Sequence, residues 1–192
     1  MSDQGIAPVS SLNGITFDAP NARIEEMGAV GMITLRGDFT SAVFADAVKA
    51  AAGVGLPDVR RFNASATGGL GWMSPDELLW VLPYADAQQA AADLSAALAG
   101  EHHMAVNVSD ARAMFRVTGA GARELIAKGA PVDMSPDAFA VGEFRRSHIG
   151  QIAAAFWADE AGLTVVCFRS LGHYLFDWLT ASAKDGATPG VY

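Results

Sequence analysis

Residues 143–168 read EFRRSHIGQIAAAFWADEAGLTVVCF, and this stretch decides the fold class. It contains three strand-like segments in direct succession, at 143–149, 151–157 and 163–168, with a polar turn at 159–162. Earlier in the chain, strand-like and helix-like segments alternate. A run of strands after such an alternation is typical of an α+β fold in which helices are layered on sheets, rather than of a regular parallel winding.

On either side of this stretch, capping and stop residues mark the helix boundaries. Thr40 is expected to cap a helix that stops at Gly53, Asp86 begins an alanine-rich helix, and Ser170 is expected to cap the last one. A fourth, short helix carries Leu125. The remaining segments are listed by residue number: strands at 30–35, 78–82, 104–108 and 113–117, and a glycine-rich segment at 54–74, flexible at 66–71, that is expected to form a hinge or hairpin.

These segments predict one globular unit over residues 15–182, which could also divide into two interlocked subdomains. A flexible N-terminal arm is expected at 1–14 and a C-terminal tail at 183–192. No basic n-region precedes an apolar stretch at the start, and the longest apolar run, 152–158, is far shorter than the ~20 residues of a membrane-spanning helix. We therefore expect a cytoplasmic protein with no membrane partner.

The composition points to a protein that assembles with others. Of the 192 residues, 51% are hydrophobic and only 18% are charged, against about 25% in an average soluble domain. With so little charge to cover the outside, more apolar surface should be exposed than suits a monomer. The net charge of −8 argues against nucleic acid as a partner, and the dense basic patches are only Arg60-Arg61 and Arg145-Arg146.

Each candidate site has a structural interpretation that the sequence favours. Gly68, Gly69 and Gly71 lack the flanking strand and Lys-Ser/Thr step of a phosphate loop. In the turn from Gly119 to Gly121, the third glycine of a dinucleotide fingerprint is replaced by Glu124, which favours a capping loop. Three further groups are also interpreted as structural. Cys167 lies in an apolar strand and is expected in the core, and the carboxylate pairs Asp76-Glu77 and Asp159-Glu160 are expected in exposed turns. The histidines, which lack the spacing of metal ligands, are His102, His103, His148 and His173. We predict no catalytic residue and no metal site, and the cofactor-binding residues are left unknown.

Two sets of motifs carry a resemblance to known families. Residues 106–125 resemble a segment of the aminomethyltransferase (glycine-cleavage T-protein) superfamily, in which a short strand is followed by a glycine-led helix. Residues 71–83, 144–157 and 165–179, in this order, resemble the gamma subunit family of bacterial heterotetrameric sarcosine oxidase. The likeness runs from about residue 30 to about residue 180.

The resemblance implies the N-terminal part of the aminomethyltransferase fold, without its C-terminal barrel. It implies a non-catalytic structural subunit beside alpha, beta and delta subunits, in a complex that converts sarcosine to glycine with hydrogen peroxide and formaldehyde, or methylenetetrahydrofolate, as products. FAD, FMN and NAD are then expected on the partners, tetrahydrofolate is the co-substrate of the complex, and no cofactor is bound by this chain. No catalytic residue carries over, because only His148 to Gln151 remains of a related signature and no aspartate has a matching local motif.

Two other functions stay open. A free-standing folate-binding or one-carbon transfer protein of the same superfamily would need an aromatic wall and a carboxylate facing the pterin. Trp72, Trp80 and Trp157 are candidate walls, although the apolar strands around Trp80 and Trp157 favour core positions for them. Trp72-Met73 and Arg145-Arg146 could instead contribute to an interface. A homo-oligomeric scaffold without an enzyme partner is the third possibility.

Overall fold

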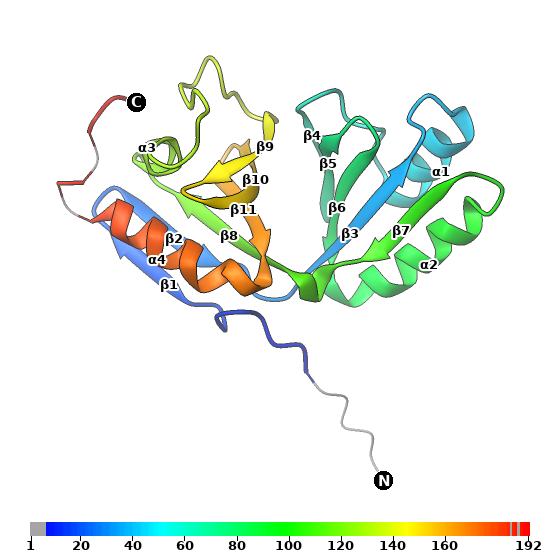
Figure 1. The fold of residues 1–192 in the computed structure, drawn as a ribbon, viewed down its shortest axis with the longest axis horizontal. Helices are drawn as coiled ribbons and strands as arrows, with labels where there is room; N and C mark the ends of the chain where they lie inside the picture. The colour runs from blue at the N-terminus through cyan, green and yellow to red at the C-terminus, as the bar shows by residue number, and fades with distance from the viewer. Residues whose placement is uncertain (1–6, 185, 188) are drawn as a thin grey trace, which may run out of the picture.

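The computed structural model describes residues 7–184, 186–187 and 189–192, which form two antiparallel sheets that face each other. Helices α1 and α2 lie outside one sheet, and α3 and α4 lie outside the other (Figure 1). This arrangement confirms the α+β class. The helices are α1 (Ala42–Ala52), α2 (Ala87–Ala97), α3 (Ala122–Ala127) and α4 (Gly172–Ala183), and short 3-10 turns span Tyr84–Asp86, Ser109–Ala111 and Arg169–Leu171.

The chain crosses between the sheets twice. It starts in the six-stranded sheet with the β1–β2 hairpin, builds the whole five-stranded sheet, and then returns through β8. The six-stranded sheet has the order β1 (Thr16–Ala19), β2 (Ala22–Glu26), β8 (Arg112–Thr118), β11 (Gly162–Phe168), β10 (Ile152–Asp159) and β9 (Phe144–Ile149). The five-stranded sheet has the order β4 (Phe62–Ser65), β5 (Gly68–Ser74), β6 (Glu77–Pro83), β3 (Val30–Gly37) and β7 (His103–Asn107).

Buried apolar side chains form three layers. One lies between the six-stranded sheet and α3 and α4, and another lies between the five-stranded sheet and α1 and α2. The third, which we call the inter-sheet cluster, joins the two sheets. It consists of Met32, Leu79, Val81, Met114, Phe144, Ala155, Trp157 and Val166. Because most strands bury both faces, they read as continuous apolar runs, and β6 and β10 could be recognised in the sequence for this reason.

The predicted strands and all four predicted helices are present, and two predicted caps are wrong. Ser41 rather than Thr40 caps α1: its hydroxyl accepts a hydrogen bond from the Phe44 amide at 3.3 Å, whereas the Thr40 hydroxyl donates to Asp38 at 2.7 Å. Ser170 lies inside a 3-10 turn before α4 and makes no cap. Gly53 ends α1 as expected, in a left-handed conformation with φ of 73°.

Of the two alternatives expected for the glycine-rich segment, a hinge or a hairpin, the structure has the β-hairpin. Its strands β4 and β5 pair, and β5 also pairs with β6 in the middle of the five-stranded sheet. A Cβ atom at Gly71 would lie 2.5 Å from Cε2 of Phe144, and one at Gly68 would overlap the Val81 carbonyl. These glycines therefore permit close approach between backbones and between sheets, which local sequence rules interpret as flexibility.

Both chain ends that the structure describes are held by buried glutamates. Glu26, 2% exposed, accepts hydrogen bonds from the Ser10 and Ser11 hydroxyls at 2.7 and 2.9 Å and from two backbone amides nearby.

Residues 1–6 of the predicted arm, and residues 185 and 188 of the predicted tail, lie outside the described residues. Strands β1 and β2, just after the arm, were not predicted. Among the described helices, none has the length and apolar character needed to cross a membrane.

Candidate functional site

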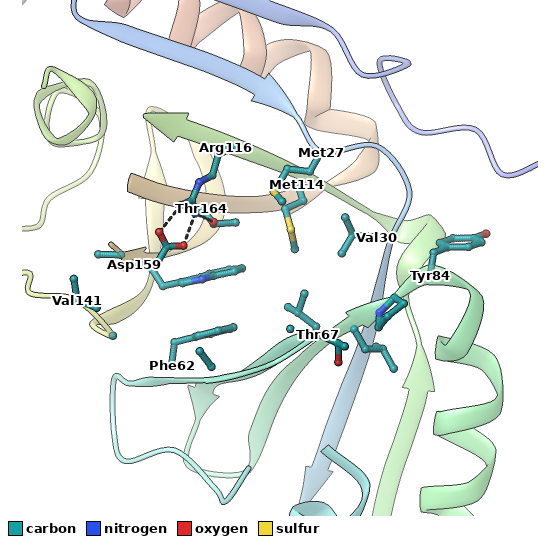
Figure 2. Close-up of a pocket in the computed structure, with 18 of the residues that line it drawn as sticks. Met27, Val30, Phe62, Thr67, Tyr84, Met114, Arg116, Val141, Asp159 and Thr164 are labelled. Atoms are coloured by element: carbon teal, nitrogen blue, oxygen red, sulfur yellow. Dashed lines mark hydrogen bonds and ion pairs between the residues drawn. The ribbon is translucent and has the colours of Figure 1, made fainter. Parts of the chain in front are cut away.

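A cavity of about 620 Å³ opens between the two sheets and is the candidate site (Figure 2). Side chains of both sheets line it, and most of them are apolar. They include Met27, Val30, Phe62, Val81, Leu82, Tyr84, Met114, Val141 and Trp157, with Arg116, Asp159 and Thr164 as the polar group. Its size falls within the range of small-molecule pockets, which are also predominantly apolar.

Stacked aromatic rings form one wall of the cavity. Phe62 from β4 and Trp157 from β10 lie nearly parallel, with ring centroids 4.5 Å apart and an angle of 6° between the planes. Phe144 on β9 lies behind them, with its centroid 5.9 Å from that of Trp157. Because the stack joins strands of the two sheets, the wall that shapes the cavity is also part of what holds the sheets together.

An ion pair occupies the polar end of the cavity. Arg116 on β8 donates from Nη1 to Asp159 Oδ2 at 2.5 Å and to Thr164 Oγ1 at 2.7 Å, and its Nη2 donates to Asp159 Oδ1. Burial alone would raise the pKa of Asp159, but the hydrogen bonds from Arg116 hold this pKa below its ordinary value. Asp159 is therefore ionised and fully engaged with the guanidinium.

This geometry suits binding better than catalysis. A general base or acid near neutral pH needs a carboxyl whose pKa is raised, and the pKa of Asp159 moves in the other direction. The Tyr84 hydroxyl points away from the ion pair and donates to Asp110 at 3.0 Å (Figure 2). The cavity is an apolar space whose polar end holds the ion pair of Arg116 and Asp159. Such a space can accommodate an apolar or flat group.

Of the three tryptophans considered in the sequence, only Trp157 reaches this cavity. Trp80 is 5% exposed and packs in the core under α1 and α2, and Trp157 is equally buried, so the predicted core positions of both are confirmed. Trp72 lines a separate pocket. Cys167 is also in the core as predicted, 1% exposed, and burial raises the pKa of its thiol to about 12.

Two carboxylates predicted in exposed turns lie elsewhere. Glu77 is 6% exposed, pairs with Arg36 at 2.5 Å and begins β6, so its predicted exposure is wrong. Asp159 is the last residue of β10 and lines the cavity, although its side chain is 43% exposed and accepts a hydrogen bond from the Ala161 amide of the turn at 2.8 Å. Register explains the difference for Asp159, because β10 extends two residues beyond Trp157.

The other candidate residues have structural partners. Glu124 is 4% exposed and accepts hydrogen bonds from the amides of Gly190 and Tyr192 at 3.0 and 3.1 Å, so it anchors the C-terminal segment. These bonds hold the pKa of Glu124 below its ordinary value. The His103 ring bonds the Ser95 hydroxyl at 2.8 Å. Within the described residues, no cluster of three or more His, Cys, Asp or Glu could hold a metal ion.

Sequence reasoning missed Phe62 and Arg116. Phe62 lies in the glycine-rich segment, where no strand pattern was recognised. Arg116 could have been found, because Arg112, Met114 and Arg116 alternate along β8 and so share one face of the sheet.

The chain is similar to known proteins over most of its length. The model of the sarcosine oxidase, gamma subunit family matches residues 36–185. A sarcosine oxidase subunit gamma from Arthrobacter sp is 29% identical over 148 residues, which cover 76% of this chain and 72% of the relative. A second, from Corynebacterium sp. (strain P-1), is 27% identical over 165 residues and covers 84% and 78%.

Solved structures show the same fold. A chain of the heterotetrameric sarcosine oxidase from Corynebacterium sp. U-96, solved with pyrrole 2-carboxylate, matches with a TM-score of 0.80 and 22% identity, covering 92% of this chain and 90% of that chain. The glycine cleavage system aminomethyltransferase T from Bartonella henselae matches with a TM-score of 0.59 and 14% identity, covering 83% of this chain and 45% of that chain. The expected likeness to the aminomethyltransferase fold is confirmed.

Proposed function

Because this chain belongs to the sarcosine oxidase gamma subunit family, we propose that it is a structural, non-catalytic subunit of a sarcosine oxidase complex. The family match spans residues 36–185 and so includes strands β4 to β7 of the five-stranded sheet, the last two residues of β3, and β8 to β11 of the six-stranded sheet. The likeness is therefore to the assembled two-sheet body, not to one motif within it.

One observation carries the non-catalytic part of the proposal. The charged groups of the inter-sheet cavity, Arg116 and Asp159, are bonded to each other rather than held ready for a substrate. The pair also draws in Thr164, so three adjacent strands of the six-stranded sheet are bonded side chain to side chain. The polar end of the cavity thus serves to hold the sheet together.

In this proposal the chemistry belongs to the partners. Alpha, beta and delta subunits would complete the complex, FAD, FMN and NAD would reside on partner subunits, and tetrahydrofolate would act as co-substrate of the complex. The complex would demethylate sarcosine oxidatively to glycine in the cytoplasm, releasing hydrogen peroxide and formaldehyde or methylenetetrahydrofolate. This chain would act as one globular unit that supports the assembly.

Gentle purification of the tagged chain from its native host tests this proposal. We expect a yellow complex with three further chains that oxidises sarcosine, with the flavin absorbance following the other chains when the complex is dissociated. A colourless chain that purifies alone would refute the subunit role. Flavin that stays with this chain after dissociation would refute its non-catalytic role.

A second candidate function, folate binding by the free chain, has one observation in its favour: the cavity has an aromatic wall of Phe62 and Trp157. The fit is poor at the polar end, because the Asp159 carboxylate that would face a pterin is already bonded to Arg116. Titration of the purified chain with tetrahydrofolate, followed by intrinsic tryptophan fluorescence, decides between the two functions. We expect no saturable quenching, and tight one-to-one binding would favour the folate-binding function.

A further inference from the structure

A surface rich in arginine lies at the opposite end of the inter-sheet cluster from the cavity. On β8, Met114 is buried in that cluster, Arg116 faces the cavity on one side of it, and Arg112 lies on the other side. Two neighbouring pockets at this end share Met73 and Arg146 in their linings, so they form one continuous surface. We define the arginine surface as Arg60, Trp72, Met73, Arg112, Arg146 and Phe168.

The guanidinium groups of this surface are only partly balanced by carboxylates of the chain, since Glu77 lines the same pocket as Arg112. Neighbouring Arg145 bonds to Glu143 at 2.6 Å and neighbouring Arg36 bonds to Glu77 at 2.5 Å. By contrast, within the part of the chain that the structure describes, Arg60, Arg112 and Arg146 make no ion pair. Arg60 and Arg146 are exposed and therefore present charge that is available to a partner, whereas Arg112 is partly buried.

Positive charge outweighs negative charge here, in a chain whose net charge is −8. The carboxylates that line the two pockets are Asp133, which accepts a hydrogen bond from the Ser135 amide at 2.9 Å, and Glu77, which is already paired. They stand against Arg60, Arg112 and Arg146, since Arg145 is paired with Glu143. The local excess of positive charge favours an anionic partner.

The backbone at Arg60 supports a functional role for its side chain. Arg60 has φ of 64°, in the left-handed region where glycine and asparagine are favoured, and its carbonyl accepts a hydrogen bond from the Phe144 amide at 2.8 Å. Holding a non-glycine residue in such a conformation costs about 1 kcal/mol or more, and outliers of this kind cluster at functional sites. Glycine would be less strained at this position, yet the sequence has arginine, which indicates that the side chain has a role.

Apolar side chains lie beside these charges. Phe168 is 47% exposed, and the Arg112 guanidinium carbon lies 4.2 Å from the centroid of its ring. Trp72 and Met73 are partly exposed and line the pocket that also contains Arg60 and Arg146. Arginine and large apolar or aromatic side chains are the residues enriched at protein interfaces, whereas a site for a small anion needs no apolar rim.

We propose that the arginine surface binds an acidic segment of a partner subunit, with its carboxylates on Arg60 and Arg146 and its apolar atoms against Trp72, Met73 and Phe168. This inference rests on the proposed function, since it identifies the surface that meets a partner. Arginine is suited to the role because its planar fork binds a carboxylate through two parallel hydrogen bonds.

Two substitutions separate binding from folding. Arg60→Gly removes the guanidinium and relieves the left-handed backbone, so the melting temperature should be unchanged or higher. Arg146→Gln removes charge from an exposed position on β9. Arg23→Gln is the matched control, because Arg23 is also an exposed strand arginine but lies on β2, paired with Asp18, away from the arginine surface.

The complex is purified through an affinity tag on this chain and diluted in series at several NaCl concentrations. Mass photometry then gives the fraction that stays assembled, and hence the dissociation constant. We expect each of Arg60→Gly and Arg146→Gln to raise the dissociation constant about tenfold or more and to flatten its salt dependence, and Arg23→Gln to leave both unchanged. If the wild-type chain brings down no flavin-containing partner, the proposed function fails, and this inference fails with it. If the wild-type complex forms and both variants assemble equally well, only this inference is overturned.

Zero-length carbodiimide coupling identifies the chemistry of the partner. The chain has only three lysines, so an amine introduced by Arg146→Lys can be followed against a low background. Coupling of that amine to an aspartate or glutamate of a co-purified subunit supports the proposal. Coupling only to Asp133 or Glu77 of the same chain, or to a second copy of this chain, overturns it.

Discussion

Close packing between the sheets at Gly71 gives a prediction whose size can be worked out from distances. A Cβ atom at Gly71 would lie 2.5, 2.9 and 3.1 Å from three carbons of the Phe144 ring, whereas ordinary contact begins near 3.5 Å. The ring would have to move by about 1 Å. Phe144 has no exposed surface and stacks against Phe62 and Trp157, so it has little room to move.

Gly71→Ala should therefore destabilise the fold. Overpacking of this kind lowers the free energy of unfolding by about 1–3 kcal/mol. The lower conformational entropy of the unfolded chain with alanine raises it by up to about 1 kcal/mol. A net loss of about 1–2 kcal/mol corresponds to a fall in Tm of about 2–8 °C for a chain of this size. Thermal unfolding followed by circular dichroism measures this shift.

Two further variants make the prediction specific. Gly55→Ala is the matched control, since no atom lies within 4 Å of its Cβ position and its backbone is not left-handed, and it should leave Tm unchanged or slightly higher. Combining Gly71→Ala with Phe144→Leu should destabilise less than the sum of the two single changes, by about 1 kcal/mol. Additive effects, or a Gly71→Ala protein as stable as wild type, would refute the described packing of β5 against β9.

Three buried groups give further predictions. Four donors hold the pKa of Glu26 below its ordinary value although burial alone would raise it, so its contribution is present above the ordinary glutamate pKa and is lost as pH falls through the lowered one. Glu26→Gln should thus lower Tm by about 4–8 °C at pH 7, with the gap to wild type closing in acid, and a gap independent of pH would contradict this. Cys167, with its pKa raised to about 12, should not react with a thiol reagent at pH 8 until the chain is unfolded, and rapid labelling of the native chain would show that it is accessible. Glu124→Ala should speed amide hydrogen exchange at residues 190–192 while leaving α4 unchanged, whereas equal exchange rates would mean that the carboxylate does not anchor this segment.

The parts of the fold that sequence predicted are those with a strong local pattern. Strands β6, β10 and β11 are apolar runs bounded by turn residues, and α1 ends at a glycine with positive φ. Strand β2 was missed because ARIEE is short and charged, even though Ala22, Ile24 and Glu26 alternate toward the core. The hairpin that contains Gly68 and Gly71 was expected only as an alternative to a hinge, because these glycines are required by tertiary contacts, which no local rule contains.

The site was less predictable because its residues are distant in sequence. Arg116 and Asp159 are 43 positions apart and meet only through the order of β8, β11 and β10. Phe62 and Trp157 come from different sheets. Glu77 was assigned to the surface because glutamate usually lies there, and its salt bridge to Arg36 becomes visible only when β3 and β6 pair.

The proposal that this chain is a non-catalytic subunit of a sarcosine oxidase complex can be tested by native mass spectrometry. The complex is purified through a tag on this chain, and sarcosine turnover is measured on the same sample. We expect an active assembly that contains this chain with three different subunits, and flavin mass on other chains when the assembly is dissociated in the gas phase. A homo-oligomer without sarcosine oxidation, or flavin retained by this chain, would contradict it.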